Sequence, residues 1–342
     1  MRIQANYSLK KRNTFKIDVK AQYLVEIEKQ SDIIVLRSDL KLAALPWIII
    51  GSASNIVFNS DLEKVVVTCR YNKINIVKED EKNVWISVGA GLEWHELVKY
   101  SVKNNLWGLE NLALIPGTVG AAPVQNIGAY GSEAQDVITR VQTLNLFTGE
   151  RSEFRHSDCQ FSYRNSIFKT QYENKQLVHR VTFRLTKLKF GQANLYYDPL
   201  KEALKHYDKS ELTPEIVFDQ IVKIRKQKLP DYKVHGNAGS FFKNPIISRD
   251  YFEELTAKFE DMPYHKTIDG DYKIPAAWLI EQAGWKGKKF SKTVGVSAKH
   301  ALVLVNYGDA KGEDIVKLST QIQEDVDHMF GIHLEREVIV IK

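Results

Sequence analysis

The stretch IPGTVGAAPVQNIGAYGSE, from Ile115 to Glu133, decides how the rest of the chain must fold around it. It is nearly free of charge and is interrupted by the glycines Gly117, Gly120, Gly128 and Gly131. Glycine costs about 1 kcal/mol per helical position and also weakens strands, so the stretch predicts a long loop. Charge-free loops are unusual on bare surface. We therefore expect a bound cofactor packed against this backbone, with Tyr130 and either Gln125 or Asn126 supplying polar contacts.

A second small-residue turn lies upstream, in LPWIIIGSASNIVF, from Leu45 to Phe58. The apolar run predicts a strand that ends at the turn GSASN, and KVVVTC, from Lys64 to Cys69, predicts the next strand. Successive backbone N–H groups and short hydroxyls in such a turn suit a pyrophosphate. A hairpin-like turn is the alternative. The spacing is not GxGxxG, so no Rossmann fold is predicted.

The segment GNAGSFFKNP, from Gly236 to Pro245, presents a single hydroxyl, Ser240. The glycines on either side of Ala238 would let backbone approach a ligand closely. The alternative is a tight turn that leads into an aromatic strand.

The segment FSYRNSIFK, from Phe161 to Lys169, places the phenol of Tyr163 beside the guanidinium of Arg164. An arginine fork can donate two parallel hydrogen bonds to a carboxylate and keeps its charge, although most arginines are simply solvated. The following residues, ENKQLVHRVTFRLTKL, predict an alternating strand.

Three further elements follow from hydrophobic spacing. A helix is expected from about Glu93 to Asn104, and a strand from Leu334 to Ile341 with Glu335 and Glu337 on one face. A second helix, near Gly312 to Phe330, has a core stripe formed by Ile315, Leu318, Ile322, Val326 and Met329.

Composition excludes several classes of protein. The chain has 342 residues, of which 44% are hydrophobic and 26% charged, which fits two or three globular domains. No signal peptide or membrane span is evident, so we expect a cytoplasmic protein with no membrane partner. The net charge of +6 is diffuse and no nucleic-acid motif is present. The dispersed histidines predict no metal, and Cys69 and Cys159 are expected to be reduced.

Together with Asn13, Thr14 and Phe15 and with LEREV near the end, these motifs resemble the UDP-N-acetylenolpyruvoylglucosamine reductase family over nearly the whole chain. The resemblance implies an α+β fold: a two-part FAD-binding region of the vanillyl-alcohol-oxidase type and a C-terminal α+β substrate-binding domain. The implied domains are 1–69 and 70–222, the latter rejoined by 333–342, and then 223–332. A monomer is expected.

The resemblance also implies an activity. NADPH would reduce non-covalently bound FAD, which would then reduce UDP-N-acetyl-enolpyruvoylglucosamine to UDP-N-acetylmuramate. This reaction belongs to peptidoglycan precursor synthesis, and through it to cell wall biogenesis, cell shape, cell cycle and division. NADPH and the UDP-sugar are the expected small-molecule partners, and no nucleic acid is expected.

By the same resemblance, Arg164 grips the substrate carboxylate and Glu337 is the acid paired with that task, which calls for a raised pKa. Ser240 is the general acid, supported by Lys228 or by an ordered water. The implied FAD contacts are Gly51, Ser52, Ala53, Ser54, Asn55, Ile115, Pro116, Gly117, Thr118, Gly120, Ala121, Gln125, Asn126, Gly128, Ala129 and Tyr130. The implied substrate contacts are Tyr130, Tyr163, Arg164, Tyr196, Lys228, Ser240 and Asn244.

Two features set this chain apart within the resemblance. Ala53 stands where the family usually has a glycine, which restricts the backbone and would weaken flavin binding slightly. FGQANLYYDPL, from Phe190 to Leu200, resembles an inserted loop whose tyrosine closes over the substrate. Tyr196 fits that lid position better than Tyr197.

Two other functions are open at this point. One is a different FAD oxidoreductase of the same superfamily that acts on an alcohol or a sugar lactone. Such enzymes often link flavin through His or Cys, and the IPGTVG and GSASN segments contain neither. The other is a catalytically silent nucleotide-sugar binder, which would not need Arg164, Ser240 and Glu337 together.

Overall fold

The computed structural model describes residues 1–342, and the chain divides into two compact units that interleave along the sequence. The first unit comprises Met1–Tyr7, Ala21–Ser52 and Leu62–Arg225. The second comprises Ser8–Lys20, Ala53–Asp61 and Lys226–Lys342. The three-domain division 1–69, 70–222 and 223–332 remains a prediction.

The first unit begins with a four-stranded sheet in the order β1-β2-β5-β3. Its strands are β1 (Arg2–Ser8), β2 (Lys20–Ile27), β5 (Leu62–Cys69) and β3 (Trp47–Ile49). Strands β2 and β3 each pair in parallel with β5, whose valines are buried. The helices α1 (Gln30–Ser38) and α2 (Leu40–Ala43) follow β2. The strand predicted over Lys64 to Cys69 is thus confirmed.

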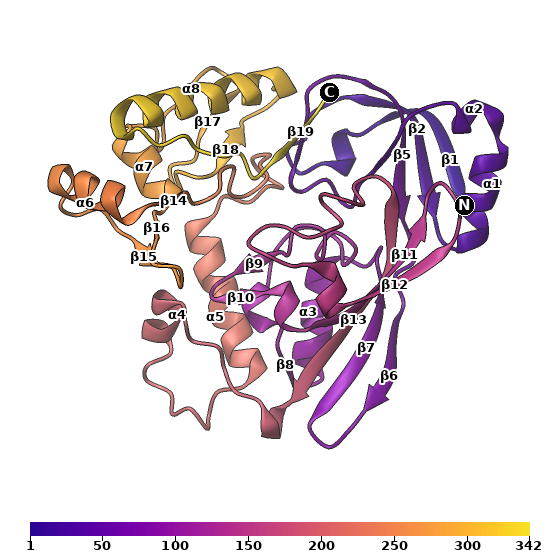
Figure 1. Cartoon of the computed structure of the whole chain (residues 1–342), viewed down its shortest axis with the longest axis horizontal. Helices are drawn as coiled ribbons and strands as arrows, with labels where there is room; N and C mark the ends of the chain where they lie inside the picture. The colour runs from indigo at the N-terminus through magenta and orange to yellow at the C-terminus, as the bar shows by residue number, and fades with distance from the viewer. The chain divides into compact units, whose positions relative to one another are not determined.

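A second, antiparallel sheet of the first unit has the order β12-β11-β13-β7-β6 (Figure 1). Its strands are β12 (Arg151–Arg155), β11 (Ile138–Asn145), β13 (Gln176–Lys187), β7 (Asn83–Gly89) and β6 (Ile74–Glu79), and β8 (Leu106–Trp107) pairs with β13. The strand predicted here is confirmed as β13, but its alternation is limited to the second half. The first residues of β13 are buried on both faces, whereas Arg184 is exposed between the buried Phe183 and Leu185. Leu177 packs in the core beneath the first sheet, whereas Val181 and Phe183 pack in the core around Trp94.

The helices of the first unit cover its larger core. They are α3 (Trp94–Lys103), α4 (Asp198–Ala203) and α5 (Pro214–Lys228), whose last three residues belong to the second unit. Helix α3 buries Trp94, Leu97 and Val98 at helical spacing, which confirms the predicted helix. Two short strands, β9 (Gly128–Ala129) and β10 (Ser132–Glu133), form a small hairpin at the end of the glycine-rich loop.

The second unit is built from short strands and three helices. Its elements are β4 (Ile56–Phe58), β14 (Ile246–Ile247), α6 (Arg249–Lys258), β15 (His265–Lys266), β16 (Tyr272–Lys273), α7 (Ala276–Gln282), β17 (Val294–Val296), β18 (Leu304–Asn306), α8 (Gly312–Phe330) and β19 (Ile339–Ile341). Helix α8 packs on α7 and on the β17–β18 hairpin (Figure 1).

The core stripe predicted for α8 is confirmed except at its last position. Ile315, Leu318, Ile322 and Val326 are fully buried. Met329 is 46% exposed, and Phe330 takes its place in the core against Phe259 and Trp278. The next residue is a left-handed glycine that ends the helix, so the stripe closes one position later than the spacing predicts.

The strand predicted from Leu334 to Ile341 is wrong in its first half. Strand β19 spans only Ile339–Ile341 and pairs in parallel with β4. Upstream of it, Glu337 N donates to Phe241 O over 2.8 Å, and Lys243 N donates to Glu335 O over 2.9 Å. The chain changes its backbone partner between Val338 and Ile339, which interrupts the regular strand.

Candidate functional site

The glycine-rich loop is irregular, as predicted, and part of what holds it is protein. Trp94 N donates to Gly117 O over 2.9 Å, and Gly120 N donates to Ala90 O over 2.9 Å. These bonds fix the loop to the turn between β7 and α3. Protein backbone therefore contributes to holding the loop in place.

Asn126 secures the centre of this loop from a fully buried position. Its Oδ1 accepts a hydrogen bond from Gln135 N over 3.0 Å, and its Nδ2 donates to Glu133 Oε2 over 2.7 Å and to Ser162 O over 3.2 Å. The backbone of Asn126 is left-handed, with φ of 44°, a conformation that asparagine tolerates better than most residues. Its carboxamide thus ties the loop to the SYRNS segment.

Two segments predicted to bind the cofactor meet at Gly51. A Cβ on Gly51 would lie 2.7 Å from Thr118 Oγ1 and 3.2 Å from Ala121 Cβ, so only glycine fits there. Beside this contact, Ser52 Oγ is buried and no protein group bonds to it. A buried, unpartnered hydroxyl between two small-residue turns fits the polar edge or phosphate of an FAD molecule. These residues therefore suit the cofactor.

Ala53 follows directly and adopts φ of 43° while being 3% exposed. This left-handed conformation costs an L-residue about 1–2 kcal/mol, whereas glycine adopts it readily. The restriction expected at this position therefore takes the form of backbone strain.

Arg164 lies against the glycine-rich loop. Its Nη2 donates to Gly128 O over 2.7 Å, and a Cβ on Gly128 would lie 2.9 Å from Arg164 Nη1. The guanidinium also lies 5.1 Å from the centre of the Tyr163 ring. Ser166 Oγ donates to Val124 O over 2.7 Å, which fastens the same segment a second time. The structure thus brings Tyr163 and Arg164 to the loop predicted to bind FAD.

Arg225 was missed from the sequence, although it contacts a predicted site residue. It lies on α5, with its guanidinium 5.7 Å from the centre of the Tyr130 ring and Nη2 3.4 Å from Leu114 O. Burial raises the pKa of Tyr130, and it lowers that of Arg225. The only signal in the sequence is a cation one position after the buried Ile224, on the helix face that packs inward.

The two tyrosines of the predicted lid segment differ in their surroundings. Tyr197 packs edge-on against Tyr130, with ring centres 5.0 Å apart. Tyr196 is 89% exposed. The role of Tyr196 over the substrate remains a prediction, and its side chain is placed where it can turn without disturbing the core.

Ser240 begins a short extended segment of the second unit that has backbone partners on both sides. Phe241 N donates to Leu302 O over 2.8 Å, while Phe241 O accepts from Glu337 N over 2.8 Å. The side chains of Phe241 and Phe242 are buried and anchor the segment. Glu337 therefore lies opposite Phe241, the residue that follows Ser240, on a neighbouring stretch of backbone.

The expected reason for the glycine at 236 is wrong. A Cβ there would lie 2.2 Å from Phe15 O, so the close approach is to backbone of the same unit rather than to a ligand. Asn237 N also donates to Thr14 O over 3.0 Å. Gly239 has φ of 69°, which explains the second glycine by conformation. The Asn13–Phe15 motif is thus a support for the Ser240 segment.

Glu337 and Glu335 are distinguished by the structure. Glu335 Oε1 pairs with Lys243 Nζ over 2.5 Å, and its side chain is exposed. The carbonyl of Glu337 accepts a hydrogen bond from Asn55 Nδ2 over 3.1 Å, which ties LEREV to the last residue of the GSASN turn. Glu337 is thus beside two predicted site segments, and Glu335 is occupied by a surface ion pair.

The remaining predicted substrate residues lie at helix ends. Asn244 Oδ1 accepts from Ala276 N over 3.0 Å and so caps α7. Lys228 is the last residue of α5, and its charge, after burial, contributes to the lowered pKa of His300. Arg164 belongs to the first unit, whereas Lys228, Ser240 and Glu337 belong to the second.

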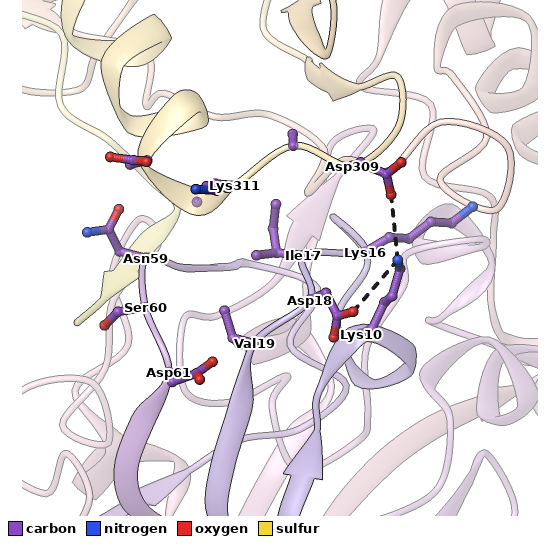
Figure 2. A pocket seen from close by; sticks show the side chains of 13 residues that line it. Lys10, Lys16, Ile17, Asp18, Val19, Asn59, Ser60, Asp61, Asp309 and Lys311 are labelled. Carbon is purple, nitrogen blue, oxygen red and sulfur yellow. Dashed lines mark ion pairs between the residues drawn. The ribbon is translucent and has the colours of Figure 1, made fainter.

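A polar pocket elsewhere in the second unit contains none of the predicted site residues. Figure 2 shows Lys10 in it between Asp18 and Asp309, at 3.9 and 3.7 Å. The charge of Lys10 is therefore compensated within this pocket.

No group of three or more His, Cys, Asp or Glu side chains could hold a metal ion, and no helix has the length and apolarity to cross a membrane. Both cysteines are unpaired, and burial raises the pKa of Cys69 to about 11 and of Cys159 to about 12.

Comparison with known proteins defines the class first. Residues 21–154 match the FAD binding domain family, so the chain is a flavoprotein of mixed α and β structure, as expected. Residues 230–341 match the C-terminal domain of UDP-N-acetylenolpyruvoylglucosamine reductase. Proteins of that name from Flavobacterium johnsoniae and Shewanella sediminis are 41% and 43% identical to this chain, covering all of it and 100% and 97% of the relatives. The chain belongs to the UDP-N-acetylenolpyruvoylglucosamine reductase family.

A solved structure agrees with the fold. UDP-N-acetylenolpyruvylglucosamine reductase from Thermus caldophilus superposes with a TM-score of 0.70 at 22% identity, and the match covers 100% of both chains. The expected fold class, a FAD-binding region followed by a C-terminal domain of its own family, is confirmed.

Proposed function

We propose that this protein catalyses the NADPH-dependent reduction of UDP-N-acetyl-enolpyruvoylglucosamine to UDP-N-acetylmuramate. The observation that carries the proposal is identity at 41% over the full length of a reductase of that name. Bound FAD would supply the hydride chemistry that links NADPH to the enolpyruvyl group. The chain's own residues bind, orient and protonate.

The cofactor would be held by the two small-residue turns that meet at Gly51 and Thr118. Ser52 Oγ is a suitable hydrogen-bond donor there, because it is buried and has no protein partner. The charge-free backbone from Ile115 to Tyr130 would line the rest of the site. The individual contacts along Gly51–Asn55 and Ile115–Tyr130 stay predictions.

Arg164 would orient the substrate carboxylate. Its guanidinium is already fixed by Gly128 O, so little side-chain freedom is lost when a carboxylate binds. Tyr163 lies against the same guanidinium and would line the same part of the site. Positive charge placed before negative charge develops is the most effective electrostatic aid to the reaction.

Ser240 would donate the proton that completes the reduction, with Glu337 and Lys228 near the reacting centre. A hydroxyl is a weak acid unless a neighbour stabilises its oxygen as the proton leaves, which is the role proposed for Lys228. Glu337 would have to be protonated, or share a proton with a neighbour, to stand beside a developing enolate. Backbone bonding of Glu337 to Phe241 supports a shared location for this residue and Ser240.

Tyr130, Tyr196, Lys228 and Asn244 would contact the UDP-sugar. The protein would act in the cytoplasm, where both water-soluble nucleotide substrates would be available, and it would supply peptidoglycan synthesis and thereby cell shape and division. A monomer is expected. Light scattering during size-exclusion chromatography tests the monomer.

The activity is tested by incubating the FAD-loaded protein with NADPH and the enolpyruvyl UDP-sugar. We expect one NADPH to be consumed for each UDP-N-acetylmuramate that mass spectrometry detects. NADPH consumption that is not accompanied by this product would refute the proposed substrate.

A further inference from the structure

Asn111 joins two loops that are distant in the sequence. It lies in the turn Glu110–Leu112 and is 1% exposed. Its Nδ2 donates to Tyr130 O over 2.8 Å and to Asn194 O over 3.0 Å. One side-chain amide therefore holds the end of the glycine-rich loop and the segment Phe190–Tyr197 together.

Asn194, in the segment Phe190–Tyr197, donates hydrogen bonds back to the glycine-rich loop. Its Nδ2 donates to Gly131 O and to Ser132 Oγ, each over 2.9 Å, and its Oδ1 accepts from Tyr196 N over 3.1 Å. The two asparagines thus form a clamp of five hydrogen bonds, and the last of these fixes the backbone of Tyr196.

The oxygen and the nitrogen of the Asn111 side-chain amide contribute differently to the fold. Asn111 Oδ1 is buried, and no protein group donates to it. An unpaired buried acceptor is destabilising, and an apolar side chain of similar size would avoid that cost. The contribution of Asn111 to the fold is therefore in its two N–H bonds to the loops.

The segment is anchored beyond the clamp at both ends. At its start, Trp107 Nε1 donates to Leu188 O over 3.3 Å, and a Cβ on Gly191 would lie 2.2 Å from Trp107 Cδ1. At its end, Tyr197 packs on the Tyr130 ring. The side chain of Tyr196 projects outward from this docked backbone, at 89% exposure.

We propose that Asn111, acting through Asn194, is a positioning residue for the UDP-sugar site. The clamp docks Phe190–Tyr197 before substrate arrives, so enclosure of the substrate requires rotation of the Tyr196 side chain rather than ordering of the loop. A docked loop loses less conformational entropy on binding than a loose one, which favours substrate affinity. The effect on substrate affinity rests on the proposed function, whereas the docking of Phe190–Tyr197 by the clamp does not.

The first test is hydrogen exchange in Asn111→Leu, which keeps the volume and removes both donors. Gln192→Ala is the matched control, since Gln192 is exposed in the same segment. We expect amides of 192–197 to exchange about 10- to 30-fold faster in Asn111→Leu, as two lost hydrogen bonds predict. The control should match the wild type. Unchanged exchange in 192–197, or faster exchange throughout the first unit, would overturn the proposal.

The second test separates the two substrates. In Asn111→Leu, the KM for the enolpyruvyl UDP-sugar should rise about 10-fold, while the rate at which NADPH bleaches the flavin stays unchanged. Asn194→Ala should behave alike, and the double variant should show less than the product of the two effects, because both break one clamp. If the effects of the two single variants on KM multiply in the double variant, the two side chains act independently and the proposed clamp is refuted. If the wild type turns over no UDP-sugar, the proposed function fails, and hydrogen exchange alone decides on the clamp.

Discussion

Glu337 N donates a hydrogen bond to Phe241 O over 2.8 Å, and this bond places Glu337 beside Ser240, although the two are 97 positions apart in the numbering. The extended segment at Ser240 has backbone partners on both sides, so the hydroxyl is presented from a fixed main chain. Held in this way, the proton donor proposed here would lose little entropy on meeting the substrate.

Ser240→Ala should separate the two halves of the reaction. We expect flavin bleaching by NADPH to persist, while reduction of the enolpyruvyl substrate falls about 100-fold or more, because only the second half needs the proton. Anaerobic rapid mixing measures each half separately. Ser210→Ala, at an exposed position, is the control. Equal loss in both halves would show that the substitution damages the fold or the flavin site.

Arg164→Lys should selectively lower kcat/KM for the enolpyruvyl substrate. Lysine retains the charge but lacks the fork that bonds Gly128 O, so we expect kcat/KM to fall about 10- to 100-fold. Steady-state kinetics with varied UDP-sugar measures this change. Arg140→Lys provides the control, since Arg140 forms an exposed pair with Glu153. A similar loss in both variants would remove Arg164 from the site.

Ala53→Gly should stabilise the protein. Relief of the left-handed strain at φ of 43° gains about 1–2 kcal/mol, and the greater freedom of glycine in the unfolded chain takes back about 0.5–1 kcal/mol. A net gain of about 1 kcal/mol should appear in urea unfolding of the flavin-free protein. Ala21→Gly, in β2, should instead lose stability. If both variants lose stability alike, the conformation assigned to Ala53 is wrong.

Glu110 should make stability depend on pH. Burial raises the pKa of Glu110 from 4.5 to about 7, and its carboxyl accepts from Gly108 N over 2.7 Å. The folded state therefore holds the proton more tightly than the unfolded chain does. The resulting contribution of Glu110 to the free energy of unfolding is fully present below pH 4.5. It is lost as the pH rises through 7, by about 3 kcal/mol in total.

Glu110→Gln removes this titration and keeps an acceptor for Gly108 N. The stability difference between variant and wild type should grow by about 3 kcal/mol from pH 4.5 to pH 8 in favour of the variant. Urea unfolding at several pH values measures it. Parallel profiles for the two proteins would contradict the raised pKa.

Sequence reasoning succeeded where one local signal dominated. The spacing of Trp94, Leu97 and Val98 sufficed for α3, and the absence of charge with repeated glycine sufficed for the loop at Ile115–Glu133. It failed at Leu334–Ile341 because the exchange of partners from Phe241 to β4 is a tertiary event without a local signal. Glycine at 236 was likewise misread, since its neighbour, Phe15, is remote in sequence.

In the candidate site, too, the sequence predicts residues that lie in motifs but not the tertiary contacts that they make. The motifs pointed to Arg164 and Ser240, but the bond from Arg164 to Gly128 and the contact of Arg225 with Tyr130 depend on long-range packing. Asn111 carries no motif at all. Its importance lies in reaching two backbone carbonyls, which only the folded chain defines.

The anaerobic visible spectrum of the purified protein tests the central claim most directly. The account predicts a yellow protein that NADPH bleaches and that regains its colour when UDP-N-acetyl-enolpyruvoylglucosamine is added. A colourless protein that binds no added FAD, or a bleached flavin that this substrate leaves bleached, would contradict it.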